Sequence, residues 1–244
     1  DALSQLCNVP KRIARNQRLL LRLRPGEQAA AGLLLVVDQQ AVGRFHRLPH
    51  TALALGQDRL STLGGEMLLL HLQTPPNQRL RYLAGQNVVL QFGHSLSAEF
   101  PVAGCPCDDR NLLFHIHNTP GNHFADYVTT KLKIGEAVMV EGPKGNFILH
   151  DDFPRPLIFI AFGSGFAPVK SLMEQVMALD SAEAMHLYWV ASHESDLYFP
   201  NWPRAMAETL DNFRYTPLVA GTNLETAAGR QEKLLDGLLQ RIVD

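Results

Sequence analysis

A short glycine-containing turn, Gly163-Ser164-Gly165-Phe166-Ala167-Pro168, holds the first residues whose types and spacing could do chemistry. Glycine lets a backbone approach a phosphate group closely, and the amides at a helix start favour an anion. Proline in the first helical turn costs no hydrogen bond, because an N–H there would have no helical partner. The turn therefore predicts a phosphate site built from backbone amides, although tight packing of a helix on a strand can require the same glycines.

This turn lies among strands and helices that alternate along the chain. Leu157–Phe162 is a continuous apolar run, typical of a strand buried on both faces, and a helical pattern follows at Pro168–Leu179. The alternation continues with a strand, a helix, a strand and a helix, at His186–Ala191, Pro203–Leu210, Phe213–Val219 and Glu225–Ile242. This order predicts βαβ units on a parallel, Rossmann-like sheet.

The residues before the turn have a different pattern, in which short apolar strands are separated by Gly, Pro and Asn clusters. Strands are expected at Met67–Leu72, Asn87–Phe92, Asn111–His117, Ala137–Glu141 and Phe147–Leu149. Such spacing is typical of an antiparallel sandwich or barrel. One helix interrupts the strands at Asn122–Lys133, where apolar residues recur at helical spacing and Gly135 follows as a stop.

We therefore predict two domains after an N-terminal segment. Residues 57–152 are expected to form an antiparallel Greek-key β-barrel, and residues 153–244 an α/β domain. The boundary falls at residues 150–156, where the hydrophobic pattern changes. Residues 1–56 are expected to be an extra β-rich segment, because Leu19–Leu23 and Leu33–Val37 are apolar runs separated by Pro25-Gly26.

Composition and charge exclude some classes of function. The net charge of −2 gives no argument for binding nucleic acid, and no apolar run reaches the roughly 18 residues of a membrane span. Residues 1–59 carry nine Lys/Arg against four Asp/Glu. This local excess favours a solvated face, with a docking surface for an acidic partner as the alternative.

The three cysteines, Cys7, Cys105 and Cys107, are too few for a disulfide framework and favour a reducing, cytoplasmic compartment. They also cannot ligate a [2Fe–2S] cluster, which takes four protein ligands. We expect Cys105 and Cys107 to be inert loop thiols, and we predict no metal site.

Six short motifs occur in a fixed order along the chain. They are Leu83-Ala84-Gly85-Gln86, Thr119-Pro120-Gly121-Asn122, Leu132–Glu136, Glu141–Phe147, Gly163–Pro168 and Leu187-Tyr188-Trp189. In this order they resemble the ferredoxin–NADP reductase family, and more closely the reductases fused to plant-type ferredoxin domains that serve oxygenases and deoxysugar pathways. The resemblance covers roughly Arg59–Arg230.

The resemblance implies a hydride relay. In the family the barrel binds FAD, the α/β domain binds NADH or NADPH, and electrons leave singly to a metal centre. The helix start at Gly121–Phe124 then faces the FAD pyrophosphate with its amides. The residues implied for FAD are Phe100, Pro101, Val102, His117, Gly121, Asn122, His123 and Phe124. Those implied for the nicotinamide nucleotide are Gly163, Ser164, Gly165, Phe166, Pro168 and Ser192.

The flavin half departs from the family signature, which has an Arg where this chain has Ala98 and a Ser where it has Pro101. Ala98 lacks the charged donor to the pyrophosphate, and Pro101 has neither a hydroxyl nor an N–H for the flavin ring. Ala125 likewise replaces a usual Ser or Thr. We therefore predict FAD that is weakly held or lost. His115, His117 and His123 could compensate if they were protonated, but a solvated or packed imidazole is favoured for them.

The nucleotide half departs as well. Trp189 is followed by Val190, Ala191 and Ser192, where the family has an Arg at the last position for the adenosine phosphate. We therefore predict that NADH is preferred to NADPH. The family's late Cys-Gly-x-Pro motif does not occur before Asp244, which is consistent with a truncated domain.

Two functions remain after these departures. The first is an NAD(P)H-dependent flavoprotein reductase module that passes electrons through FAD to a partner redox centre. The alternative is a flavin-free member of the same fold that acts as a structural or regulatory subunit of a complex. The sequence assigns no catalytic residue.

Overall fold

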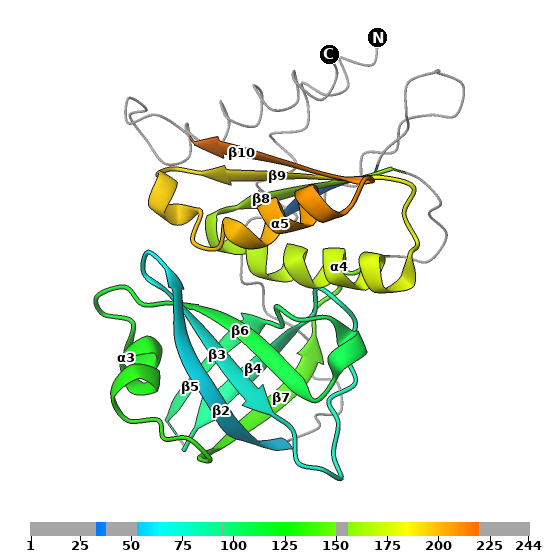
Figure 1. Ribbon diagram of the computed structural model, residues 1–244. Coiled ribbons are helices and arrows are strands. Elements are labelled where there is room, and N and C mark those ends of the chain that lie inside the picture. The colour runs from blue at the N-terminus through cyan, green and yellow to red at the C-terminus, as the bar shows by residue number, and fades with distance from the viewer. Residues whose placement is uncertain (1–32, 38–52, 94, 150–155, 220–244) are drawn as a thin grey trace. The chain divides into compact units, whose positions relative to one another are not determined.

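The computed structural model describes residues 33–37, 53–93, 95–149 and 156–219, which fall into two compact units (Figure 1). The antiparallel unit holds the strands between Leu53 and Lys144 together with the helices α3 (His123–Thr130) and α4 (Phe166–Leu179). The parallel unit holds the strands β1 (Leu33–Val37), β8 (Leu157–Phe162), β9 (Met185–Ala191) and β10 (Phe213–Val219) and the helix α5 (Asn201–Thr209).

Six strands form the sheet of the antiparallel unit. They are β2 (Leu53–Gly64), β3 (Met67–Gln73), β4 (Asn87–Phe92), β5 (Leu96–Pro101), β6 (Asn111–His117) and β7 (Ala137–Lys144). Their order is β5-β4-β7-β2-β3-β6, and every neighbouring pair is antiparallel. Burial alternates along β4, where Val88, Leu90 and Phe92 are buried and their neighbours only partly so. This period of two places one face of the sheet on the hydrophobic core.

The expected barrel is not closed by strand pairing among the described residues, since β5 and β6 are the two edges of the sheet. β5 ends at Pro101, which has no N–H to donate to a ladder. The next amides bond to different strands: Val102 N donates to Gln86 O (3.1 Å) and Ala103 N donates to Leu113 O (2.8 Å). The hydrogen bond from Ala103 N to Leu113 O is thus a single link to β6, at the place where a ladder between β5 and β6 would be needed to close a barrel. The antiparallel sheet is confirmed, and in the part of the chain that the structure describes strand pairing does not close it into a barrel.

Several expected elements have the predicted bounds or nearly so. β4 and β6 match the prediction residue for residue, and α4 begins two residues before Pro168. The strand expected at Phe147–Leu149 does not form, because β7 itself runs on to Lys144 and regular structure ends there. The strands β2 and β5 were not predicted. The helix expected at Glu225–Ile242 and most of residues 1–56 lie outside the described residues.

The sheet of the parallel unit has the order β1-β8-β9-β10, and all three pairings are parallel, as the alternating pattern predicts. β9 is buried along almost its whole length, and β8 along most of it. β1 was expected in a separate N-terminal segment, but it pairs with β8 in register from Leu33↔Leu157 to Val37↔Ala161. Within the described residues, no helix has both the length and the apolar character that crossing a membrane requires.

Candidate functional site

An aromatic cluster forms the side of the antiparallel unit where the flavin residues were predicted. Phe100 on β5 packs against Phe124 at the start of α3, with ring centroids 4.8 Å apart. Phe92 on β4 contacts Phe124 and Tyr127, at centroid distances of 5.0 and 4.8 Å. Phe124 is buried while Phe100 is only partly so. The structure therefore brings Phe100 and Phe124 together and leaves Phe100 partly exposed.

The backbone of β5 offers little to a bound cofactor. Phe100 pairs with Val88 in the β4–β5 ladder, Pro101 lacks an N–H, and the amide of Val102 already donates to Gln86 O. The carboxylate of Glu99 accepts a hydrogen bond from Asn87 Nδ2 (2.8 Å), which links β5 to β4.

The amides at the start of α3 are already hydrogen-bonded. Asn122 is the N-cap residue, and its Oδ1 accepts from Phe124 N (3.1 Å) and Ala125 N (3.2 Å). The amide of His123 donates to Gly121 O (3.1 Å). Asn122 Nδ2 also donates to His117 O (2.6 Å), which links the end of β6 to the helix. The helix start is therefore capped by the chain itself, as Asn at an N-cap favours.

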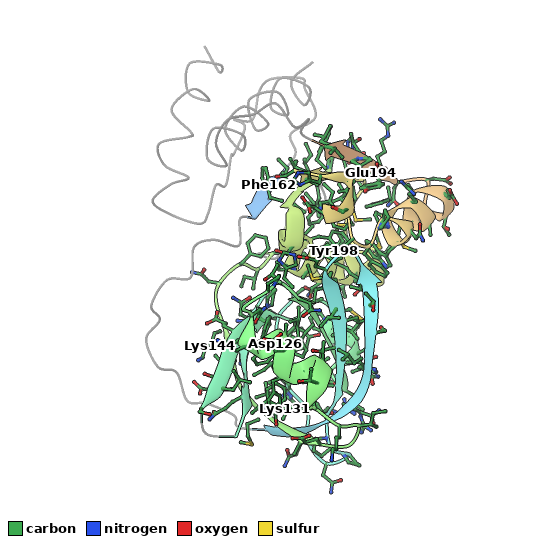
Figure 2. The ribbon with its side chains drawn as sticks, turned by 90° about the vertical axis from the view of Figure 1, so that its left-hand side faces the viewer. Asp126, Lys131, Lys144, Phe162, Glu194 and Tyr198 are labelled. Carbon is green, nitrogen blue, oxygen red and sulfur yellow. A yellow bond between two sulfur atoms is a disulfide. The ribbon has the colours of Figure 1, made fainter. Side chains whose placement is uncertain are left out.

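The histidines named as compensating cations are placed poorly for that role. His117 lies 3.8 Å from a Glu66 oxygen and His123 lies 3.9 Å from an oxygen of Asp126, which Figure 2 labels. Any positive charge on either ring is thus offset by a neighbouring carboxylate. Burial, with the charge of Lys170 as a smaller cause, lowers the pKa of His115 to about 3. His115 is therefore neutral at ordinary pH, because a buried imidazolium is not solvated, and this is the packed imidazole that the sequence favoured over a cation.

The nucleotide residues begin at Gly163, whose φ of +48° a residue with a side chain adopts only under strain. Its carbonyl accepts a hydrogen bond from Trp189 Nε1 (3.0 Å), and Trp189 packs edge-on against Tyr198 (labelled in Figure 2) with centroids 5.2 Å apart. The end of β8 is therefore fixed within the parallel unit by two aromatic residues. Sequence reasoning gave Trp189 as part of a motif but missed this contact.

The start of α4 differs from that of α3. Its N-cap is Gly165, and no side chain caps it. Phe166 and Pro168 are both buried in the first turn, and Phe166 lies over His115 with centroids 6.4 Å apart. The aromatic contact and the buried proline fix the position of the helix start, where the backbone N–H groups give a positive end to the helix.

The end of β9 carries the last predicted residue, Ser192, which is exposed. It is followed by the short helix η3 (Glu194–Asp196), and the Asp196 carboxylate accepts a hydrogen bond from His193 N (2.9 Å). The segment after Ser192 therefore presents carboxylates, and no Arg occupies the position of Ser192.

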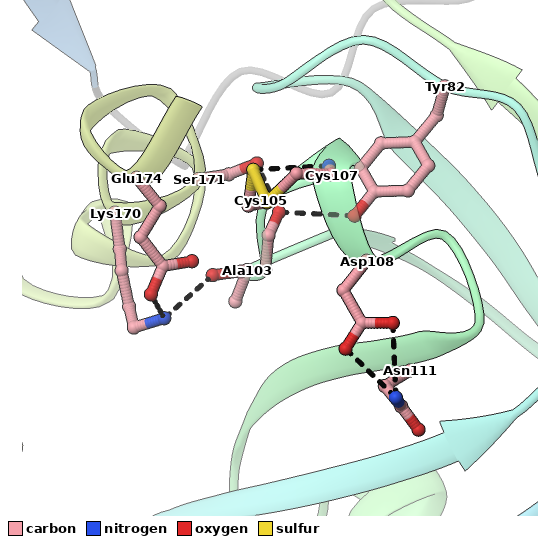
Figure 3. The surroundings of a disulfide bond; sticks show 10 residues. Tyr82, Ala103, Cys105, Cys107, Asp108, Asn111, Lys170, Ser171 and Glu174 are labelled. Atoms are coloured by element: carbon pink, nitrogen blue, oxygen red, sulfur yellow. Dashed lines mark hydrogen bonds and ion pairs between the residues drawn. A yellow bond between two sulfur atoms is a disulfide. The ribbon is translucent and has the colours of Figure 1, made fainter. Parts of the chain in front are cut away.

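Sequence reasoning missed the contacts between α4 and the loop after β5. Lys170 Nζ donates to Ala103 O (3.2 Å) and pairs with Glu174, and Ser171 Oγ donates to Gly104 O (2.6 Å) (Figure 3). The polar pair Lys170-Ser171 within the apolar stretch of the helix was the available signal. In the same loop Cys105 and Cys107 form a disulfide, so the expectation of two inert thiols is wrong. Within the described residues, no cluster of His, Cys, Asp or Glu could hold a metal ion.

Comparisons with known proteins agree with this fold. Residues 159–244 match the oxidoreductase NAD-binding domain family. A CDP-6-deoxy-L-threo-D-glycero-4-hexulose-3-dehydrase reductase of Yersinia pestis is 29% identical over 166 residues, 67% of this chain and 49% of that protein. Reductase component 1 of terephthalate 1,2-dioxygenase from Comamonas sp is 31% identical over 150 residues, 62% of this chain and 44% of that protein. Over roughly two thirds of its length, the chain is therefore similar in sequence to these two reductases.

A solved structure extends the likeness to the fold of the chain. The ferredoxin NADP+ reductase of Neisseria gonorrhoeae with bound FAD and NADP superposes with a TM-score of 0.61 at 18% identity, over 81% of this chain and 80% of that one. At this identity the likeness shows the fold alone. The chain spans about half the length of the curated relatives named above.

Proposed function

We propose that the chain is the reductase module of an electron-transfer system, which takes electrons from a nicotinamide nucleotide and passes them through FAD to a partner redox centre. The observation that carries this proposal is the glycine-containing turn between β8 and α4. It combines a positive-φ glycine, a helix start without a side-chain cap and a buried proline in the first turn. This arrangement suits a phosphate group that binds to backbone amides.

The bound nucleotide is NADH rather than NADPH in this proposal. Gly163, Ser164, Gly165, Phe166 and Pro168 form the phosphate turn, and Ser192 lies where the adenosine end of the nucleotide would bind. The extra 2′-phosphate of NADPH calls for a positive charge there. The segment beyond Ser192 instead carries Glu194 and Asp196, which repel a phosphate.

The residues present fit one part of FAD and not the other. The partly exposed Phe100 ring suits the flat face of a flavin, whose chemistry is to accept a hydride and release electrons singly. The α3 amides that a pyrophosphate would need are capped, and the carboxylates of Glu66 and Asp126 lie near His117 and His123. Of the eight residues implied for FAD, only the Phe100 ring therefore fits without rearrangement. We infer that FAD, if it binds, binds weakly and requires the Asn122 side chain to leave the helix start.

The partner is a redox protein or a complex that contains one, and the compartment is the cytoplasm. Both the relatives named above are reductases, and the chain spans only part of their length. The domain division proposed from the sequence, 1–56, 57–152 and 153–244, is kept for the order of the sheets along the chain, with β1 and α4 as exceptions that belong to the parallel and the antiparallel unit respectively.

A second candidate is a flavin-free subunit that keeps the fold for a structural or regulatory role. The observation that favours it is the double hydrogen bond from Asn122 Oδ1 to the amides of Phe124 and Ala125. These are the donors that a pyrophosphate would need, and the chain satisfies them by itself.

One experiment separates the two candidates. FAD is titrated into the flavin-free full chain and followed by flavin fluorescence, and NADH oxidation is then measured with ferricyanide as a one-electron acceptor. The reductase proposal predicts saturable, weak FAD binding and NADH oxidation that requires added FAD. Absence of FAD binding at any concentration, with NADH binding retained, would overturn it in favour of the flavin-free subunit.

A further inference from the structure

The loop that joins β5 to β6 contains a disulfide between Cys105 and Cys107, with one residue between them (Figure 3). The short helix η1 (Pro106–Asp108) begins within this loop, with Cys105 as its N-cap. Cys107 N donates a hydrogen bond to Cys105 Sγ (3.1 Å). Nothing in the proposed electron-transfer function uses these two sulfurs.

The disulfide is not needed to hold the loop. The carbonyl of Gly104 accepts from Tyr82 Oη (3.1 Å) and from Ser171 Oγ (2.6 Å), both buried contacts. Ala103 is bonded through its amide to Leu113 O. A ring that closes over one residue also removes little entropy from the unfolded chain, far less than a bridge across a long loop. A purely structural role therefore explains the bond poorly.

The two sulfurs differ in access. Cys105 is 8% exposed, whereas Cys107 is exposed. An incoming thiolate can therefore reach Cys107, and Cys105 becomes the leaving group. The N–H of Cys107 points at Cys105 Sγ and would stabilise the thiolate that leaves, because an anion accepts a stronger hydrogen bond than a neutral sulfur. Access and hydrogen bonding thus favour the same direction of attack.

We propose that Cys105 and Cys107 form a thiol–disulfide exchange site, which a dithiol reduces by attack at Cys107. The attacking thiolate forms a bond to Cys107 Sγ, the Cys105–Cys107 bond breaks, and Cys105 takes a proton from water. The second thiol of the dithiol then attacks the reagent sulfur that is bonded to Cys107 Sγ. This releases Cys107, which takes up a proton. Two electrons and two protons enter the protein, and the dithiol becomes a disulfide.

The first test counts thiols in the folded full chain with Cys7→Ser, so that the other two cysteines alone remain. The protein is incubated with oxidised or reduced dithiothreitol, trapped with N-ethylmaleimide and weighed by intact mass spectrometry. The proposal predicts no adduct after the oxidised reagent and two after the reduced one. Two adducts after both treatments, or none after the reduced reagent under native conditions, would overturn it.

The second test checks the direction of attack. Cys105→Ser and Cys107→Ser, each with Cys7→Ser, are reacted with glutathione disulfide, and circular dichroism confirms that both variants are folded. The variant that keeps Cys107 should form the mixed disulfide at least about tenfold faster, because its sulfur is exposed. Equal rates, or a faster reaction at Cys105, would contradict the proposed direction and with it the site.

Discussion

The starts of α3 and α4 both follow a glycine-containing turn, and the sequence predicts an anion site at each. The structure distinguishes them by one residue. At α3 the N-cap is Asn122, whose side chain accepts from two amides, whereas at α4 the N-cap is Gly165 and no side chain caps the helix. A glycine turn before a helix is therefore not sufficient evidence for a phosphate site. The residue at the N-cap position decides whether a side chain occupies the helix start.

The largest effect is expected from Gly165→Val, which puts a branched side chain where the nucleotide phosphate should approach the α4 backbone. We expect NADH affinity to fall by about 100-fold, or about 2.7 kcal/mol, in a fluorescence titration. Ser164→Ala is the matched control and should change the affinity little, because backbone amides rather than the hydroxyl bind the phosphate. If a folded Gly165→Val variant binds NADH with unchanged affinity, the start of α4 is not the phosphate site.

The next effect concerns the flavin half, where Ala98→Arg combined with Pro101→Ser supplies a cation and a hydroxyl donor. We expect FAD to bind up to about 2–3 kcal/mol more tightly, since hydrogen bonds to charged groups lie in that range. Titration of FAD into each flavin-free protein measures the gain. Tight, stoichiometric FAD in the unmodified chain would show instead that other residues already hold the phosphate.

His115, which lies beneath Phe166 at the start of α4, should make stability depend on pH. Its folded pKa of about 3 is below the ordinary histidine value of 6.5, so protons bind to the unfolded state first as the pH falls. Between pH 7 and pH 5 this should lower the free energy of unfolding by about 2 kcal/mol, and the loss continues until the pH approaches the folded pKa.

Urea denaturation at pH 7 and pH 5 measures this fall in the free energy of unfolding. The fall should be absent in the His115→Gln variant. His123→Gln removes a histidine whose side chain is 89% exposed and should leave the pH dependence as it is in the parent. If His115→Gln loses as much stability as the parent between pH 7 and pH 5, the imidazole is not the cause.

The smallest expected effect comes from the cap of α3. Asn122→Ala should lower the free energy of unfolding by about 1 kcal/mol, because it removes a cap, while freeing two amides for FAD. Denaturation with and without FAD distinguishes the two consequences. Asn122→Ser keeps a capping oxygen and is the control. A variant that is less stable and binds FAD no better would indicate that α3 is not a phosphate site even when uncapped.

The sequence predicts the locally determined parts of this fold best. β4 and β6 have the predicted bounds because their apolar residues and flanking turns mark them directly. β1 could not be placed, because it pairs with β8 more than a hundred residues later, and no short pattern records a parallel partner. Among the described residues, β5 and β6 do not pair because the amides after Pro101 bond to Gln86 and Leu113. These partners are also distant in sequence, so a short pattern does not record them.

At the candidate site, too, the features set by nearby residues could be predicted, and those set by distant contacts could not. The glycine turn and the weakened flavin signature were visible in the sequence, and Phe100 and Phe124 do meet. The capping role of Asn122 could have been predicted, since Asn before a helix is itself an N-cap signal. A packed, neutral His115 was the favoured alternative from the sequence, and its low pKa agrees with it. The Cys105–Cys107 bond could not be predicted, because it depends on loop geometry.

The hydrogen bonds from Lys170 and Ser171 to the loop after β5 bear on how this chain could be divided genetically. α4 belongs by its packing to the antiparallel unit, yet β8 and β9 on either side of it in the sequence belong to the parallel unit. A gene fragment that ends near residue 152 would leave the carbonyls of Ala103 and Gly104 without these buried donors. We therefore expect the two halves of the chain to be poor modules for exchange between proteins. A working transplant would have to carry α4 with the strands that precede it.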